Sequence, residues 1–427
     1  MTDKQLEKVV DSKSLDADDC QAQTIVSEIL KNIKTNGDKA INYYETKFSQ
    51  NNLKNYLVDK KEIENVKISL ADQKAIQYAY KNIYEFTKLQ LPKDLKLNNK
   101  DKTLMKKYIP IENVGLYIPG GTAPLVSTSL MVIIPALVAK CKRIVLCTPC
   151  NKDNQINPAI LYVAKLCKIK EIYKVGGAQA IGLMAYGTQT IKQVNKIFGP
   201  GNKFVMEAKK QINGNVNGCT IDMPAGPSEV LIIADTTAIP QFVASDMLAQ
   251  LEHDICAKAV LITNNKKLVG AVEKEIQKQL LTLSRKAIIN ESLKNAKIII
   301  VDDLEQAFDL ANKFAPEHLM LQIKNPNKYL IKISNAGSVF IGNYSSEALG
   351  DYVSGTNHVL PTSGNAKSYS GLSVTAYMKE VTFQEITKTG IENMKSSLVQ
   401  LADIEGLDAH KNSVLIRLKN MKGVSNE

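Results

Sequence analysis

The chain has 427 residues, of which 44% are hydrophobic, and a formal net charge of +11. This length is too great for one small core, so we expect two or more lobes of ordinary domain size. No stretch approaches the ~20 apolar residues of a membrane span, and the N-terminal residues lack the apolar region of a secretory signal. We therefore expect a cytoplasmic protein that makes no membrane contact.

The basic charge does not indicate a nucleic-acid partner. Only Arg143, Arg285 and Arg417 among the 54 basic residues are arginine, whereas base and phosphate recognition depend strongly on the bidentate guanidinium group. The lysines are scattered along the chain and form no basic block of the kind that marks a binding tail. We expect no binding to nucleic acid.

Residues 19–90 carry a polar, helical pattern, and after them strand and helix signals alternate. The strand signals are short β-branched runs: VGLYI, RIVLC, EIYKV, VNKIF, EVLII, AVLIT, KIIIV and GSVFIG. This alternation predicts parallel sheets covered by helices, an α/β fold. Eight or more strands over about 230 residues favour two α/β lobes over one closed barrel. From about Ser370 the strand pattern stops, and we expect only helices in the tail.

Three of these strands run directly into turns that contain glycine. The turns lie in VGLYIPGGTAP, KVGGAQAIG and KIFGPGNKF, at residues 114–124, 174–182 and 196–204. Backbone amides and a helix N-terminus meet a phosphate in this arrangement, although no turn holds a complete G-x-G-x-x-G and each alone is typical of a tight βα connection. Together they suggest a nucleotide site.

A further segment, IDMPAGPSEVLIIAD at residues 221–235, places prolines and glycine just before an apolar strand. Such a rigid loop could direct Ser228 and Glu229 into a cleft, and it is equally suited to be a stiff connection between lobes.

The sequence contains four histidines, and two of them have neighbours that could carry chemistry. His253 ends a helical run three residues after Gln250, so both side chains share a helix face and could hold one ion. A histidine near a helix C-terminus is also common without a ligand. Glu317 and His318 precede an apolar strand, where they could form an acid–base pair or simply face solvent.

The other two histidines lie nearer the C-terminus. His358 belongs to a long polar stretch, residues 347–364, in which Asp351 offers a hard oxygen ligand. Long polar loops in compact enzymes are often functional. His410 follows Glu405 by five residues in a late helical run. Because no two histidines are close in sequence, a metal site would have to combine distant segments.

Six motifs occur together and in one order along the chain: VGGAQAIG, KIFGPGNKFVMEAK, IDMPAGPSEV, the Gln250–His253 helix, PEHL and GDYVSGTNHVLPT. In order and character they resemble the histidinol dehydrogenase family. The resemblance extends from about Val114 to Val414 and is weaker in the N-terminal helices. It implies oxidation of L-histidinol through L-histidinal to L-histidine, the last steps of histidine biosynthesis, with two NAD⁺ and one zinc ion per subunit. The alternative is a related zinc- and NAD-dependent dehydrogenase that acts on another amino alcohol or a sulfonate.

The resemblance also implies roles for individual residues. The zinc ligands would be Gln250, His253, Asp351 and His410. The zinc would orient the substrate, His318 would be the general base and Glu317 would activate water. The substrate would contact Ser228, Gln250, His253, His318, Asp351, His358, Glu405 and His410. The NAD contacts would be Tyr117, Gln179 and Asn202.

The family fold implies a homodimer with shared active sites, in which each subunit has two Rossmann-like α/β lobes. The expected parts are an N-terminal arm (1–20), a first lobe (21–113 and 229–370), a second lobe on the NAD side (114–228) and a small helical C-terminal domain (371–427). That domain would reach the partner subunit, so Glu405 and His410 would act across the interface. One departure from the family pattern follows His253, where Asp-Ile-Cys-Ala-Lys replaces the usual Gly-Pro turn.

Overall fold

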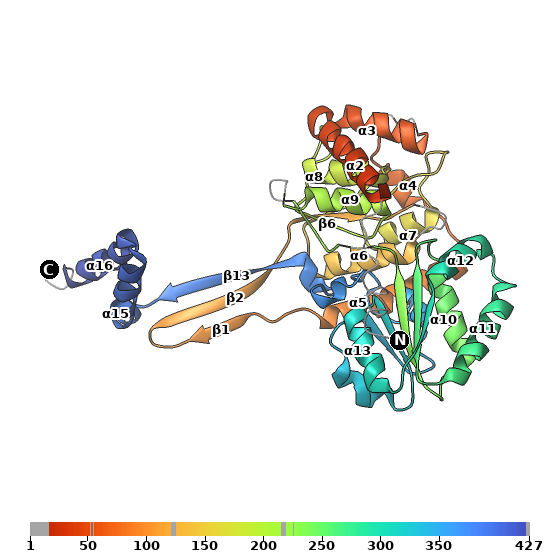
Figure 1. Cartoon of the computed structure of the whole chain (residues 1–427). Helices are drawn as coiled ribbons and strands as arrows, with labels where there is room; N and C mark the ends of the chain where they lie inside the picture. The colour runs from red at the N-terminus through yellow and green to blue at the C-terminus, as the bar shows by residue number, and fades with distance from the viewer. Residues whose placement is uncertain are drawn as a thin grey trace. The chain divides into compact units, whose positions relative to one another are not determined.

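The computed structural model describes residues 17–51, 53, 55–120, 125–214, 219–224 and 226–423. Most of the expected N-terminal arm therefore lies outside the described residues. The chain divides into two compact units, one of Met1–Gln90 with Ile111–Tyr377 and one of Leu91–Pro110 with Met378–Glu427. The predicted α/β class is confirmed, since both large sheets are parallel and covered by helices (Figure 1).

The first sheet of the larger unit has five parallel strands in the order β5-β4-β3-β6-β7. The strands are β3 (Asn113–Tyr117), β4 (Arg143–Cys147), β5 (Glu171–Tyr173), β6 (Lys196–Phe198) and β7 (Thr220–Ile221). The helices between them are α6 (Val126–Val138), α7 (Pro158–Leu166), α8 (Gly177–Tyr186) and α9 (Lys203–Ile212). The chain first moves from β3 to β4 and β5, then returns to the other side of β3 with β6. Such a reversal opens a crevice at the carboxyl ends of the two strands, here β3 and β6.

The second sheet also has five parallel strands, in the order β10-β9-β8-β11-β12. They are β8 (Glu229–Ala234), β9 (Lys258–Thr263), β10 (Lys297–Ile300), β11 (His318–Gln322) and β12 (Ser338–Ile341). Its helices are α10 (Pro240–Leu251), α11 (Lys266–Leu280), α12 (Lys286–Ser292), α13 (Leu304–Phe314) and α14 (Glu347–Tyr352). Alternate residues of a strand face opposite sides, and accordingly Val230 and Ile232 pack toward α10 and α11 while Leu231 and Ile233 pack toward α13.

The N-terminal helices pack differently from the expected division. These are α2 (Ala17–Asn36), α3 (Asp38–Tyr44), the π-helix η1 (Glu45–Ser49), α4 (Lys60–Glu64) and α5 (Leu70–Leu89). We expected residues 21–113 to join the lobe of 229–370, but α2 and α3 share a core with the first sheet (Figure 1). The reason is the apolar face of α2, where Val26, Leu30 and Ile33 recur at helical spacing. Gly182 of α8 lets that face approach closely, because a Cβ there would lie 2.7 Å from Ile33 Cδ1.

The smaller unit is a three-stranded antiparallel sheet followed by two helices (Figure 1). Its elements are β1 (Leu95–Asn98), β2 (Lys102–Pro110), β13 (Met378–Ile386), α15 (Lys388–Glu405) and α16 (Asp408–Gly423). The expectation of a tail without strands is wrong at β13, which pairs along its whole length with β2. Most residues of β13 are exposed on both faces, so the alternation that marks a half-buried strand is absent. The compact C-terminal part thus begins at Met378 and includes residues 91–110.

Four short 3₁₀ helices complete the described elements: η2 (Leu293–Asn295), η3 (Pro326–Lys332), η4 (Asn365–Lys367) and η5 (Val374–Tyr377). No helix in the described ranges has the length and apolar character needed to cross a membrane.

Candidate active site

A cavity in the larger unit collects most of the side chains that the sequence suggested. It is lined by Ser228, Gln250, His253, Glu317, His318, Asp351 and His358. One side of the cavity follows the carboxyl ends of the first sheet, at Gly199 after β6 and Asp222 after β7. The other side precedes or begins strands of the second sheet, at Ser228 before β8 and His318 at the start of β11. The carboxyl edge of one sheet thus faces the amino edge of the other across the cavity.

Glu317 and His318 are held by β11, the strand between β8 and β12. Both are buried, and Glu317 Oε2 accepts a hydrogen bond from the backbone N–H of Glu229 at 2.9 Å. Burial disfavours the charged forms. It raises the pKa of Glu317 well above its ordinary value and lowers the pKa of His318 to about 4. His318 is therefore neutral at neutral pH and able to accept a proton.

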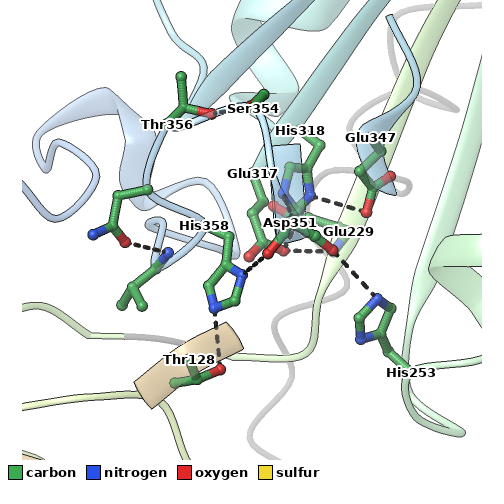
Figure 2. Close-up of polar contacts among 12 residues, drawn as sticks. Thr128, Glu229, His253, Glu317, His318, Glu347, Asp351, Ser354, Thr356 and His358 are labelled. Carbon is green, nitrogen blue, oxygen red and sulfur yellow. Dashed lines mark hydrogen bonds and ion pairs between the residues drawn. The ribbon is translucent and has the colours of Figure 1, made fainter. Parts of the chain in front are cut away.

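The imidazole of His318 is surrounded by carboxylates. Its Nδ1 lies 3.5 Å from Glu347 Oε1 and its Nε2 lies 3.8 Å from Asp351 Oδ1 (Figure 2). Within the described residues, both ring nitrogens are buried without a hydrogen-bond partner. Unsatisfied buried polar atoms are rare and often mark a binding or catalytic role, so these nitrogens are suited to a ligand that enters the cavity.

A cluster beside His318 has the donors of a metal site. His253, Glu347 and Asp351 each offer a ligand atom, and these atoms lie within 4.8 Å of one another. His253 Nε2 is 3.8 Å from Asp351 Oδ2 (Figure 2), and the buried amide of Gln250 donates to the Glu347 carboxylate. The described ion pairs of this cluster involve histidine and no lysine or arginine. Nitrogen and oxygen donors without a lysine or arginine beside them fit a zinc ion.

Glu347 is a member of this cluster that the sequence analysis did not identify. Its side chain is buried, and burial together with the neighbouring Asp351 and Glu317 carboxylates raises its pKa well above the ordinary value. The available signal was its spacing, because Glu347 precedes Asp351 by four residues and the two share one face of α14. The expected ligand His410 and the expected substrate contact Glu405 belong to the smaller unit, where both are exposed.

His358 has both ring nitrogens engaged by the protein. Nδ1 lies 2.8 Å from the carbonyl oxygen of Asp351, so this nitrogen carries the proton and donates. Nε2 then accepts from the Thr128 hydroxyl at 3.0 Å (Figure 2). His358 therefore ties the start of α6 to α14, and it presents its ring to the cavity.

Glu229 is buried and acts through its backbone as well as its side chain. Its N–H donates to Glu317, while its carboxylate accepts from the N–H of Ser363 at 2.9 Å. Burial raises the pKa of Glu229 to about 7. The first residue of β8 thus orients Glu317, a role of Glu229 that could not be foreseen from the sequence.

The residues expected to contact NAD follow strands of the first sheet. Tyr117 ends β3, and its hydroxyl accepts from the N–H of Gly177 at 3.0 Å. Gln179 lies in the first turn of α8 and donates to Glu45 Oε1 at 2.8 Å. Asn202 caps α9, since its Oδ1 accepts from two backbone amides of the first turn at 3.1 Å each. None of the three lines the cavity described above.

The turn after β6 lies against β3 and is built from glycine for a steric reason. Gly199 has φ +119°, and a Cβ there would lie 2.1 Å from the carbonyl oxygen of Tyr117. A buried ion pair holds the turn: Lys209 Nζ donates to Gly199 O at 2.8 Å, and Asp222 Oδ2 accepts from Gly199 N at 2.8 Å. The side chains of Lys209 and Asp222 are each about 1% exposed, and Lys209 Nζ lies 2.5 Å from Asp222 Oδ1. The turn after β6, which borders the crevice between β3 and β6, is therefore held in place.

Glu45 is a second residue of this region that the sequence analysis did not identify. It is completely buried in η1 and accepts from Gln179 and from the N–H of Gly176 at 3.2 Å. Burial raises the pKa of Glu45 above its ordinary value. No local motif links it to the first sheet, because Gly176 and Gln179 lie more than 130 residues away along the chain.

Comparison with known proteins agrees with these features. The sequence model of the histidinol dehydrogenase family matches residues 12–418. The histidinol dehydrogenase of Vibrio parahaemolyticus is 42% identical over 424 residues, covering 99% of this chain and 97% of its own length. That of Campylobacter jejuni is 44% identical over 428 residues, with 99% and 98% covered. The crystal structure of histidinol dehydrogenase from Elizabethkingia anophelis superposes with a TM-score of 0.93 at 43% identity, covering 99% and 97%. The chain belongs to the histidinol dehydrogenase family of oxidoreductases.

Proposed function

We propose that this chain oxidises L-histidinol to L-histidinal and then to L-histidine, with two NAD⁺ and one water, as the last steps of histidine biosynthesis in the cytoplasm. Family membership supports the reaction class. The observation that carries the proposal is the buried pair Glu317–His318, beside a cluster of metal-type donors in one cavity.

The zinc ion would be held by Gln250, His253 and Asp351, with His410 of the partner subunit as a fourth ligand. Glu347 lies close enough to take part in the same cluster. When bound, zinc supplies a Lewis-acidic point that orients the amino and imidazole nitrogens of the substrate. The support is the donor set itself, which holds nitrogen and oxygen atoms of the kinds that zinc prefers.

Proton transfer is assigned to the two residues at the start of β11. His318 accepts the hydroxyl proton of the alcohol at a ring nitrogen, which it can do because burial keeps the imidazole neutral. In the second oxidation it does the same for the hydrated aldehyde. Glu317, in its carboxylate form, takes a proton from the water that hydrates the aldehyde, and its raised pKa makes that carboxylate a stronger base.

The cofactor is proposed to lie along the carboxyl edge of the first sheet. NAD⁺ supplies the hydride acceptor for each of the two oxidations. Tyr117, Gln179 and Asn202 would hold it, and Gly199 permits the close approach of the β6 turn to β3. The reversal of strand order between β3 and β6 supports this location.

The smaller unit is proposed to act on the partner subunit of a homodimer. Glu405 and His410 are exposed, and the nearby apolar side chains Leu401, Ile404 and Leu407 are exposed as well. Exposed apolar groups around polar ones are typical of a surface that another subunit covers. Glu405 would then contact the substrate and His410 the zinc of the partner's site, and an isolated monomer would be inactive.

The test is spectrophotometric. Purified protein is expected to form NADH from L-histidinol and from L-histidinal, with loss of activity on chelation and recovery on addition of zinc. A panel of other amino alcohols and sulfonates distinguishes a related dehydrogenase. A zinc-loaded dimer that forms NADH from another member of the panel and none from histidinol would overturn the proposal.

A further inference from the structure

A buried carboxylate outside the proposed ligand set connects the elements that carry the site. Asp246 lies in α10, four residues before Gln250, and is 4% exposed. Its Oδ1 accepts from the Ser346 hydroxyl at 3.0 Å, and its Oδ2 accepts from the Gln322 side-chain amide at 2.8 Å. Burying a carboxylate is costly, and among the described residues no cation forms an ion pair with it. Burial raises its pKa to about 6.

The two partners of Asp246 belong to different elements around the second sheet. Gln322 is the last residue of β11, the strand whose first residue is His318. Ser346 immediately precedes α14, which carries Glu347 and Asp351. One carboxylate therefore links α10, which carries Gln250, to β11, which begins at His318, and to the N-cap of α14, the helix of Glu347 and Asp351.

The conformation of Ser346 indicates that this contact is specific. Serine at a helix N-cap usually accepts a hydrogen bond from an amide of the first turn. Ser346 occupies that position of α14 but makes no such bond, and its hydroxyl is directed to Asp246 instead. The helix has only six residues, and Leu349 and Tyr352 are 49% and 58% exposed. Gly350 lies close to the Phe340 ring, but the exposed side chains of Leu349 and Tyr352 contribute little apolar packing that would hold α14 in place.

We propose that Asp246 is a positioning residue for the metal cluster. By holding Ser346 and Gln322 it sets the distance between α14 and α10, and so places Glu347 and Asp351 opposite Gln250 and His253. This inference rests on the metal role proposed above.

The experiment compares zinc affinity in three variants with the full-length wild type. Asp246→Asn keeps the size of the side chain but turns an amide N–H₂ toward one of the two donors. Ser346→Ala removes only the hydroxyl. The matched control is Asp235→Asn, since Asp235 is another buried carboxylate beside the second sheet, whose partners are Thr237 and the N–H of Lys324. Zinc dissociation constants are measured by competition with a chromophoric chelator, and folding by thermal unfolding of the metal-free proteins.

Asp246→Asn and Ser346→Ala are expected to weaken zinc binding on the order of tenfold, as is typical when the support of metal ligands is removed. Asp235→Asn is expected to lower thermal stability without changing zinc affinity. A folded Asp246→Asn with the wild-type dissociation constant would overturn the inference. If Asp246→Asn does not fold, the test rests on Ser346→Ala, and an unchanged zinc dissociation constant of that variant would overturn the inference. Failure of the wild type to bind zinc would instead refute the proposed function, and this inference with it.

Discussion

The two sheets of the larger unit border one cavity, the first with the carboxyl ends of its strands and the second with the amino ends. The two sides of the cavity are lined by different kinds of groups. The first sheet offers its carboxyl edge, where ligands of open α/β sheets ordinarily bind. Its wall is mainly backbone: Gly199 approaches Tyr117, and Lys209 with Asp222 clamps the turn from within. The second sheet offers its amino edge, and its wall consists of the titratable side chains Glu317 and His318.

In the proposed function this difference separates cofactor binding from proton transfer. A wall built mainly from backbone can hold a cofactor by shape and by amide groups. A wall of buried carboxylates and an imidazole is poised for proton transfer, since burial moves the pKa values of Glu317 and His318 far from their ordinary values in opposite directions. Mutations on the two walls should therefore have different kinetic signatures.

The largest effect is expected from His318→Gln, on the side-chain wall. Loss of the neutral base should reduce kcat by on the order of 10²–10⁴-fold, whereas zinc affinity should remain near that of the wild type because His318 is not a proposed ligand. Steady-state kinetics with L-histidinol and a zinc competition assay measure the two quantities. A variant that loses zinc as well as turnover would place His318 in the metal site.

Removal of the metal is expected to have the next largest effect. His253→Ala should lower zinc affinity strongly, and activity should return in part at high zinc concentrations, which His318→Gln cannot show. The exposed position of His253 beside Asp351 makes a folding defect a minor contribution. Equal zinc contents in His253→Ala and His318→Gln, measured by atomic absorption, would contradict the division of roles between them.

Much of the architecture could be predicted from sequence because its strands are buried in a regular pattern. All eight β-branched runs are strands, and seven suggested residues line the same cavity. The failures have physical causes. β13 is exposed on both faces, and its partner β2 lies more than 260 residues earlier, so neither alternation nor proximity marks the pair. Helix α2 has one apolar face, but the lobe that this face covers is decided by tertiary packing.

The residues of the site that escaped prediction are buried carboxylates. Glu45, Asp246 and Glu347 look like ordinary surface acids in sequence, and their importance comes from partners far along the chain. Burial of an acid is rare without a compensating contact, but burial is a property of the folded chain. Only the four-residue spacing of Glu347 from Asp351 offered a local signal.

A smaller effect is expected from the backbone wall, for which Gly199→Ala is the most direct probe. The added Cβ would collide with the carbonyl oxygen of Tyr117 at 2.1 Å, and φ +119° is unfavourable for alanine. We expect a loss of about 1–3 kcal/mol in the free energy of unfolding and a raised KM for NAD⁺, with zinc affinity unchanged. Gly270→Ala in α11 is the control, because no atom lies within 4 Å of its Cβ and alanine favours the helix by about 1 kcal/mol. A Gly199→Ala variant with a normal KM for NAD⁺ would show that the β6 turn is not part of the cofactor site.

The smallest effect is expected from Gln179→Leu, which tests whether the backbone wall also uses a side chain. Leucine keeps the approximate volume but cannot donate to Glu45, which would lose one of its two hydrogen bonds described here. If Gln179 contacts the cofactor, KM for NAD⁺ should rise several-fold while kcat at saturating NAD⁺ stays near the wild-type value, the signature of lost binding without lost chemistry. Glu45→Gln keeps an oxygen that can accept from Gln179, so it should change KM for NAD⁺ less than Gln179→Leu. A fall in kcat with an unchanged KM for NAD⁺ would mean that Gln179 affects the chemical step. Cofactor binding and proton transfer would then not be separate functions of the two sheets.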